Sequence, residues 1–314
     1  MKRKGLLTLC LSSLGIANAQ YVDTIQSVVK IHYNNPGIFV MAANAGVSAE
    51  TQAVDGGVIH PQAFGEVNFR PFSRFAIHAK ATHQFNQFWQ NQDINDTRTY
   101  EATTSIYLTQ QTLKKNKVFT AGTKMYNYDF IAPVNVRWNT GIIGGYKQGS
   151  GVFNTGFDQS SAVQFSNSES DNRYHLDKIA VPFTFQEVSA GFVVSTNSRF
   201  KIDVTLPDGK IKSRRMKTYT QFSVQAVYGL SYDMAQTVVV RNPKLKNAEM
   251  THNVHSGTII PWGYKLAGTF NRKLTTLKVE AGSKPGAYQR FSGGESPSFV
   301  DRSYFSIGLG LGWM

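Results

Sequence analysis

The last twelve residues of the chain, SYFSIGLGLGWM at 303–314, carry its strongest structural signal. Large apolar residues alternate with very small ones, and an alternation of period two places the two sets on opposite faces of a β-strand. In a helix the same residues would scatter around the axis, and each glycine would cost about 1 kcal/mol relative to alanine. The stretch therefore predicts a strand with one apolar face (Phe305, Ile307, Leu309, Leu311 and Trp313) and one bare face (Ser306, Gly308, Gly310 and Gly312).

The same alternation recurs along most of the chain. In 219–232, for example, Phe222 and Val224 alternate with Ser223 and Gln225. Further alternating segments lie at 74–83, 98–109, 199–206, 262–270 and 274–282. No amphipathic helical pattern of comparable quality is present. We therefore expect an all-β protein.

The N-terminus has the features of a secretory signal peptide. Lys2, Arg3 and Lys4 precede an apolar stretch at 5–16, and Ala17-Asn18-Ala19 forms a small-residue cleavage site. We expect residues 1–19 to be removed and residues 20–314 to form a single domain. An N-terminal membrane anchor is the alternative, although the apolar stretch is shorter than the roughly 20 residues that span a bilayer. No later stretch approaches 18 consecutive apolar residues, which argues against a helical membrane protein.

The connections between the alternating segments are short and long in turn. Short ones lie at 70–73, 111–116, 207–210 and 271–273, whereas long polar ones lie at 84–97, 233–261 and 283–301. Short periplasmic turns and long extracellular loops are typical of outer-membrane barrels. About 12 strands are expected, at 37–48, 58–69, 74–83, 98–110, 117–127, 133–148, 182–195, 199–206, 211–232, 262–270, 274–282 and 302–313. A further hairpin in 149–181 would raise the count to about 14.

Alternation alone fits two architectures. A secreted soluble β-sandwich or adhesin would turn its apolar faces toward a dry core, whereas a transmembrane barrel turns them toward lipid. Three features favour the antiparallel transmembrane barrel: polar faces rich in Gln, Ser, Thr and paired charges, aromatic residues such as Tyr219 and Trp262 at strand ends, and a chain that ends on a strand. The residues that we expect to line the lumen are Lys80, Glu101, Lys201, Asp203, Gln225, Lys265, Lys278 and Glu280.

Basic residues dominate the charge. The net charge is +13, of which the signal peptide contributes three, and such an excess favours anionic partners. The segment 210–217 and the segment 241–246 concentrate it, and 114–117 adds three lysines. We expect outer-membrane lipids and lipopolysaccharide phosphates, or an acidic periplasmic or secretion-system protein, as partners, and no nucleic acid. The candidate anion- or partner-binding residues are Lys210, Lys212, Arg214, Arg215, Lys217, Arg241, Lys244 and Lys246. Solvated turn residues are the alternative interpretation.

Nothing in the sequence predicts a catalytic centre. No nucleophile motif such as G-x-S-x-G appears, and His255 and Ser256 are adjacent, so that on a strand they would point to opposite faces. His252 and His255 lack a visible third metal ligand. A cluster of His78, Lys80 and Glu101 is interpreted as charge balance inside a barrel. We expect no enzyme activity, no catalytic or metal-binding residues and no cofactor.

The signal sequence that ends in Ala-Asn-Ala-Gln, the tyrosine-rich strands and the terminal GLGLGW resemble bacterial outer-membrane β-barrel proteins. The segment YNNPGIFVMAANAG at 33–46 also resembles the N-termini of type IX secretion-associated barrels. The resemblance implies a protein of the outer membrane of a Gram-negative envelope. We expect a non-enzymatic, porin-like barrel that forms a pore for small solutes if its lumen is clear. The alternative is an envelope scaffold or secretion-accessory barrel that binds a partner through basic turns or loops.

Overall fold

The computed structural model describes residues 29–33, 41–52, 59–85, 96–122, 127–156, 163–167, 170–176, 178–205, 209, 211–235, 237–241, 249–253, 258–272, 274–288 and 302–313. The predicted signal peptide at 1–19 lies outside them. The strands are β1 (Val29–Tyr33), β2 (Met41–Gln52), β3 (Ile59–Phe72), β4 (Phe75–Gln84), β5 (Thr97–Gly122), β6 (Asn127–Gly156), β7 (Val163–Asn167), β8 (Ser170–Leu176), β9 (Lys178–Thr205), β10 (Ile211–Met234), β11 (Thr237–Arg241), β12 (Glu249–Asn253), β13 (Thr258–Ile260), β14 (Trp262–Arg272), β15 (Thr275–Ser283), β16 (Gly286–Tyr288) and β17 (Ser303–Trp313). Within these ranges no helix is long and apolar enough to cross a bilayer.

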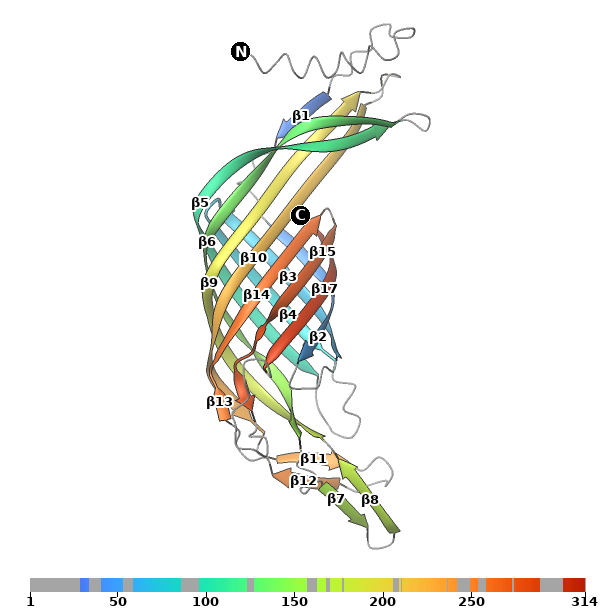
Figure 1. Ribbon diagram of the computed structural model, residues 1–314, viewed down its shortest axis with the longest axis vertical. Helices are drawn as coiled ribbons and strands as arrows, with labels where there is room; N and C mark the ends of the chain where they lie inside the picture. Colours follow the sequence, from blue (N-terminus) through green and yellow to red (C-terminus); the bar gives the residue numbers. More distant parts are fainter. Residues whose placement is uncertain are drawn as a thin grey trace. The chain divides into compact units, whose positions relative to one another are not determined.

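One antiparallel sheet closes on itself (Figure 1). Neighbouring strands follow the order β9-β10-β14-β15-β17-β2-β3-β4-β5-β6, and β6 pairs again with β9. The last strand, β17, pairs with the first strand of the ring, β2, from Tyr304↔Gln52 to Trp313↔Ala43. Among the described strands β1 lies outside the ring and pairs only with β9. The predicted antiparallel transmembrane barrel is confirmed, and a closed ring rules out the two-sheet sandwich.

The ring contains ten of the described strands, close to the count of about 12 expected from the sequence. The expected turns at 111–116 and between 195 and 199 are wrong, because β5 and β9 continue through both. Polar residues suggested a turn at 111–116, but a strand that continues beyond a bilayer can expose polar side chains. A hairpin does form within 149–181, as β7 and β8, but it makes a separate two-stranded sheet and does not raise the strand count of the ring. The segment 151–156, expected to be one arm of the hairpin, belongs instead to β6 and pairs with β9.

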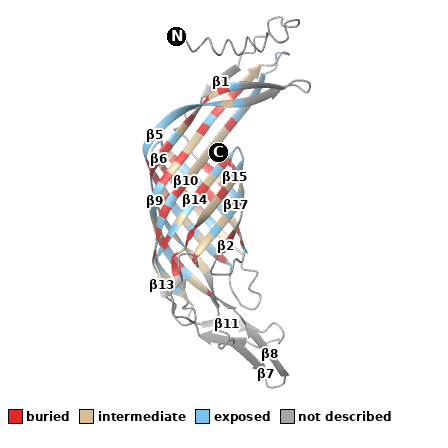
Figure 2. Ribbon diagram, viewed as in Figure 1, coloured by how far each residue is buried: buried red, intermediate tan, exposed pale blue. Residues whose placement is uncertain are grey.

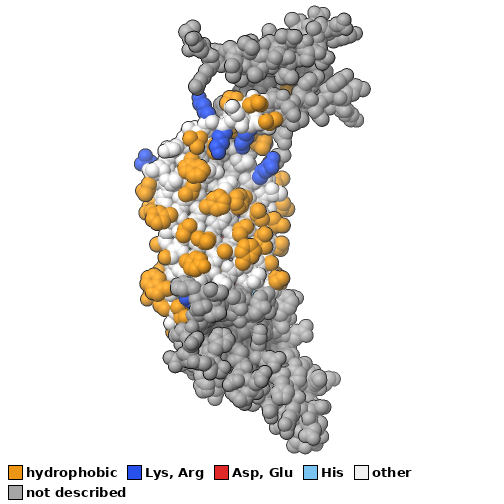
Figure 3. Space-filling view, viewed as in Figure 1, with side chains coloured by type: hydrophobic (Ala, Val, Ile, Leu, Met, Phe, Trp, Pro, Cys, Tyr) orange, Lys and Arg blue, Asp and Glu red, His pale blue; other side chains and the backbone are white. Residues whose placement is uncertain are grey.

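Side chains on the ring alternate between buried and exposed (Figure 2). The exposed set is apolar, and hydrophobic side chains cover the visible face of the described strands (Figure 3). It includes Val47, Ile77, Ile106, Ile142, Phe192, Val224, Leu266 and Leu309, each at least 38% exposed. The buried set is rich in polar residues, such as Asn44, Glu66, Asn139 and Gln225. Apolar side chains outside and polar ones inside are the arrangement of a transmembrane barrel.

The position of β17 in the ring explains the alternation of large apolar residues and glycines in its sequence. Phe305, Ile307, Leu309 and Leu311 are 45–65% exposed on the outer face. On the inner face, the ring of Phe64 from β3 lies so close that a Cβ atom at Gly308 would come within 3.2 Å of it, and one at Gly310 within 3.1 Å. The glycines therefore leave room for an aromatic ring inside the barrel.

The chain divides into two compact units. Unit 2 comprises 35–115, 135–199 and 216–314 and contains the ladders of the ring. Unit 1 comprises 1–34, 116–134 and 200–215. In unit 1, β1 pairs with β9 from Val29↔Val204 to Tyr33↔Phe200, and the buried side chains are Ala132, Val134, Phe200 and Ile202.

The connections alternate between the two ends of the ring because the strands are antiparallel. Strands β3, β5, β9 and β14 run in the same direction, and the link that follows each of them is five residues or shorter. The end of the ring at which β3 and β14 finish is called the turn end. The links at the other end, the loop end, include the two small sheets β7–β8 and β11–β12 and the pair β13–β16. The short turns and long loops expected from the sequence thus fall at opposite ends.

Candidate functional site

Ion pairs cross the interior of the ring. Lys80 of β4 donates to Glu280 of β15 with an Nζ–Oε1 distance of 2.9 Å, and these strands are four positions apart in the ring. Lys265 of β14 donates to Glu101 of β5, again across four positions. The interior of an eight-stranded barrel is just wide enough for side chains to fill it. A ten-stranded barrel is only slightly wider, so long side chains from opposite walls meet inside it.

A second group of polar contacts centres on Glu66 of β3. Asn44 Nδ2 donates to Glu66 Oε1 at 2.7 Å, and His78 Nε2 lies 2.8 Å from Oε2. Lys278 of β15 forms an ion pair with the same carboxylate, and its Nζ lies 5.1 Å from the ring centroid of Phe64. Glu66 is only 5% exposed, so several donors compensate for the burial of its charge.

Nearer the turn end, a third group contains neutral and cationic side chains. The guanidinium of Arg70 lies 4.6 Å from the ring centroid of Tyr107, and Arg70 Nη2 donates to Asn139 Oδ1 at 3.4 Å. Asn139 Nδ2 donates to Ser195 Oγ at 3.1 Å. The described interior therefore contains three groups of side-chain contacts: the crossing ion pairs, the contacts around Glu66 and the contacts around Arg70.

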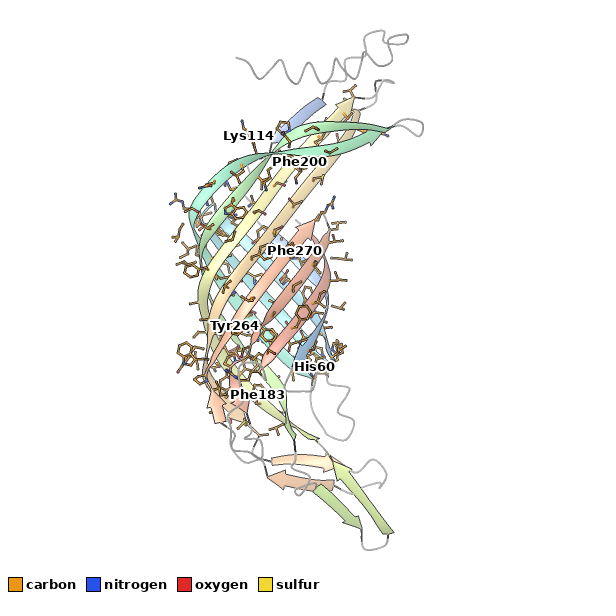
Figure 4. The ribbon with its side chains drawn as sticks, in the orientation of Figure 1. His60, Lys114, Phe183, Phe200, Tyr264 and Phe270 are labelled. Carbon is orange, nitrogen blue, oxygen red and sulfur yellow. The ribbon has the colours of Figure 1, made fainter. Side chains whose placement is uncertain are left out.

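The interior opens into two adjoining cavities toward the loop end. The larger has a volume of about 90 Å³ and the smaller about 50 Å³. Both are bordered by Glu50, Glu101, Lys147, Glu187, Glu280 and Lys284. Phe183 lines the larger cavity and Tyr264 the smaller, and the two lie at the same end of the ring in Figure 4. We call the larger cavity the loop-end cavity.

The residues predicted to line the lumen fall into two groups. Lys80, Glu101, Lys265, Lys278, Glu280 and Gln225 belong to unit 2 and make the interior contacts of the ring; Gln225 accepts from Ser189 Oγ at 2.9 Å. Lys201 and Asp203 belong to unit 1, where they form an ion pair of 2.9 Å. They alternate along β9 with the buried Phe200 and Ile202.

The predicted anion- or partner-binding residues are also divided. Lys212 and Arg215 are exposed on β10 of unit 1, and Lys217 is half-buried on the same strand. Arg241 lies on β11, where it pairs in register with Glu249. The side chains of Arg214 and Arg241, and residues Lys210, Lys244 and Lys246, lie outside the described set.

Several charged residues of the interior were not among the sequence predictions, including Glu50, Glu66, Arg70, Lys147, Glu187 and Lys284. Glu66 and Lys80 face each other in the β3–β4 ladder, and Lys147 and Glu187 face each other in the β6–β9 ladder. Glu66, Lys147 and Glu187 therefore lie on the inner faces of alternating strands, whereas Lys284 directly follows β15. Their charge on that face was a visible signal, but their partners depend on how the ring closes.

The described side chains offer no evident metal site. Within these residues no group of three or more His, Cys, Asp or Glu side chains is arranged to hold a metal ion. The carboxylates of the interior instead face lysine ammonium groups, and such pairs balance charge rather than attract a cation.

The sequence matches no protein-family model and no curated protein. Among solved structures, the chain is similar to the CymD monoaromatic hydrocarbon channel, with 8% identity and a TM-score of 0.21 over 87% of each chain. It is also similar to in-vitro folded OmpT, an outer membrane protein of Vibrio cholerae, with 8% identity and a TM-score of 0.17 over 93% of this chain and 100% of that one. Values this low carry no argument, so the barrel assignment is based on the closed ring and its apolar exterior.

Proposed function

We propose that the chain is a non-enzymatic scaffold of the outer membrane that holds an acidic periplasmic protein through unit 1. The observation that carries this proposal is strand length. Strands β5, β6, β9 and β10 contain 26, 30, 28 and 24 residues, whereas about 9–11 residues cross a bilayer. A pore does not need the additional residues, whereas a partner-binding module does.

The chemistry of unit 1 supports a protein partner. Lysine and arginine exceed the acidic residues in 29–34, 116–134 and 200–215, with Asp129, Asp203 and Asp208 as the only acidic residues there. Val118, Ile131 and Ile211 are 63–66% exposed. Apolar side chains next to basic ones suit a protein interface, in which apolar contacts supply affinity and charge guides the encounter.

The topology supports a periplasmic location for the partner. The short links β5–β6 and β9–β10 follow strands that run in the same direction as β3 and β14, and short links of barrels face the periplasm. Lipopolysaccharide lies on the other side of the membrane. The apolar exterior of the ring supports the outer membrane as the location of the whole protein.

The filled interior argues against an open pore. The pairs Lys80–Glu280 and Lys265–Glu101 join opposite walls, and side chains fill the barrel again around Glu66 and Arg70. Steady conduction needs a continuous path for hydrated ions. We therefore expect the purified barrel to be silent in planar bilayers.

Site-specific photo-crosslinking tests the proposal. A photoreactive residue at the exposed Lys212 in unit 1 should give a discrete protein adduct in intact cells, and the adduct should disappear in the Arg215→Glu background. The matched control is the same residue at Leu309, which is 64% exposed on the ring and should react with lipid only. The absence of an adduct at Lys212, together with steady conductance of the purified protein, would favour the pore and overturn the scaffold.

A further inference from the structure

Charges of opposite sign alternate around the ring at the two adjoining cavities, of which Lys80 borders only the larger and Lys265 only the smaller. Going around the ring, Glu50 of β2 is followed by Lys80 of β4, Glu101 of β5, Lys147 of β6, Glu187 of β9, Lys265 of β14 and Glu280 of β15, and Lys284 follows β15. The lysines and glutamates of this set are equal in number. A site with no net charge gains little from a lone anion or a lone cation, because either ion leaves one wall charge uncompensated.

Three of the four pairs in this set are hydrogen-bonded and one is open. Lys80–Glu280, Lys265–Glu101 and Lys284–Glu50 are joined by hydrogen bonds. Lys147 Nζ, by contrast, lies 3.8 Å from Glu187 Oε2, beyond hydrogen-bond distance. The Lys147 side chain is 29% exposed, close to the 27% of the hydrogen-bonded Lys284, so the distance is what distinguishes the open pair.

The surroundings of the open pair are suited to a small organic molecule. Lys147 Nζ lies 5.2 Å from the ring centroid of Phe185, and the ring of Phe183 lies 5.8 Å from that of Phe185. Tyr232 donates to Glu187 Oε1 at 3.3 Å, which holds the carboxylate in place. Thr82, Thr99 and Ser150 add hydroxyl groups to the same cavity. Donors, acceptors and apolar rings thus converge on one space.

The geometry points to a binding site for a small zwitterion of the amino-acid class in the loop-end cavity. The carboxylate of the ligand pairs with the Lys147 ammonium group, and the ammonium group of the ligand pairs with the Glu187 carboxylate. The apolar part of the ligand contacts Phe183 and Phe185. The ligand inserts into the open pair and leaves the net charge unchanged. A cavity of about 90 Å³ holds roughly six to nine groups of water size, which matches alanine or valine. This site goes beyond the scaffold function and does not depend on it.

Equilibrium binding to the folded barrel in detergent tests the site with three probes of similar size. L-Valine should bind, whereas isovalerate, which lacks the ammonium group, and isobutylamine, which lacks the carboxylate, should bind at least tenfold more weakly. Equal binding of isovalerate and valine would indicate a plain anion site and overturn the proposal, as would the absence of valine binding. This comparison uses the unchanged protein and needs no variant to fold.

Variants then assign the residues. Lys147→Met and Glu187→Gln should each weaken valine binding at least tenfold, while Lys147→Arg should keep it within about threefold. Lys201→Met is the matched control, because it removes a lysine from the ion pair with Asp203 in unit 1 and should leave binding unchanged. Each variant is accepted only if it shows the heat-modifiable gel mobility of a folded barrel. Unchanged valine binding by folded Lys147→Met would overturn the assignment.

Discussion

Strand β9 buries different side chains in the two units. Within unit 2 its buried residues mix the polar Glu187 and Ser195 with the apolar Val181 and Val193, while the apolar Phe192 is 72% exposed. Within unit 1 the buried residues are Phe200 and Ile202, at 2% and 1% exposure, and they alternate with Lys201 and Asp203. The difference lies in the side chains that alternate with the buried ones: the apolar Phe192 on the outer face of the ring, and the charged Lys201 and Asp203 in unit 1. The outer face of the ring meets lipid, whereas this part of β9 in unit 1 suits contact with water. Alternation alone does not tell which medium a face meets.

The largest effect is expected in the core of unit 1. Phe200→Ala should destabilise unit 1 by about 3–5 kcal/mol, because it removes a fully buried aromatic ring. The readout is hydrogen exchange of 200–205, which should become much faster. Phe192→Ala in the ring is the control and should change the same exchange little. Equal effects of the two substitutions would show that both rings lie in the same kind of environment.

A charge on the outer face of the ring should have the next largest effect. Leu309→Arg should lower the free energy of unfolding by about 2–4 kcal/mol in lipid vesicles, since an arginine near the middle of a bilayer is poorly solvated. Urea titration of the folded band by gel mobility measures it. A neutral result would mean that this face meets water.

Overpacking of the inner face should cost less. Gly308→Ala places a Cβ about 3.1 Å from Ser48 Cβ and 3.2 Å from the Phe64 ring, and such crowding costs about 1–3 kcal/mol. The same urea titration applies. If crowding against the Phe64 ring causes the loss of stability, the double variant Gly308→Ala/Phe64→Leu should lose less stability than the sum of the two single variants. A loss equal to that sum would show that the contact with Phe64 is not the cause.

The smallest effect on stability is expected at the basic surface of unit 1. Lys212→Ala and Arg215→Ala should each change stability by no more than about 0.5 kcal/mol, because both side chains are exposed. They should nevertheless weaken the partner adduct described above. A large loss of stability would instead give these side chains a structural role.

Much of the ring follows from local pattern. The alternation at 303–313, 219–232 and 74–83 predicted strands because successive side chains of a strand point to opposite faces. The alternation of short and long links predicted the two ends. The two wrong turns, at 111–116 and between 195 and 199, were placed at polar residues that interrupt the alternation. Polar residues such as Lys114 and Asn197 look like turn residues in a sequence, but they continue a strand that has partners.

The interior contacts were harder to predict from the sequence. Lys80, Glu101, Lys265 and Glu280 stand out on polar strand faces, and that much is local. Their pairing joins residues separated by 200 and 164 positions along the chain, and no local pattern encodes such a separation. The open pair of Lys147 and Glu187 lies on the neighbouring strands β6 and β9, and its Nζ–Oε2 distance of 3.8 Å is a feature of the folded ring that no sequence pattern shows.

By itself, the sequence determined the period of the strands, their apolar and polar faces, and the excess of basic residues, because each of these depends on neighbours only a few positions apart. Tertiary structure decided the ten-stranded closure, the partner of each lysine, the open pair at the loop-end cavity, and the change of polarity along β9. These depend on which strands lie beside and across from one another, and that is settled only when the whole ring has closed.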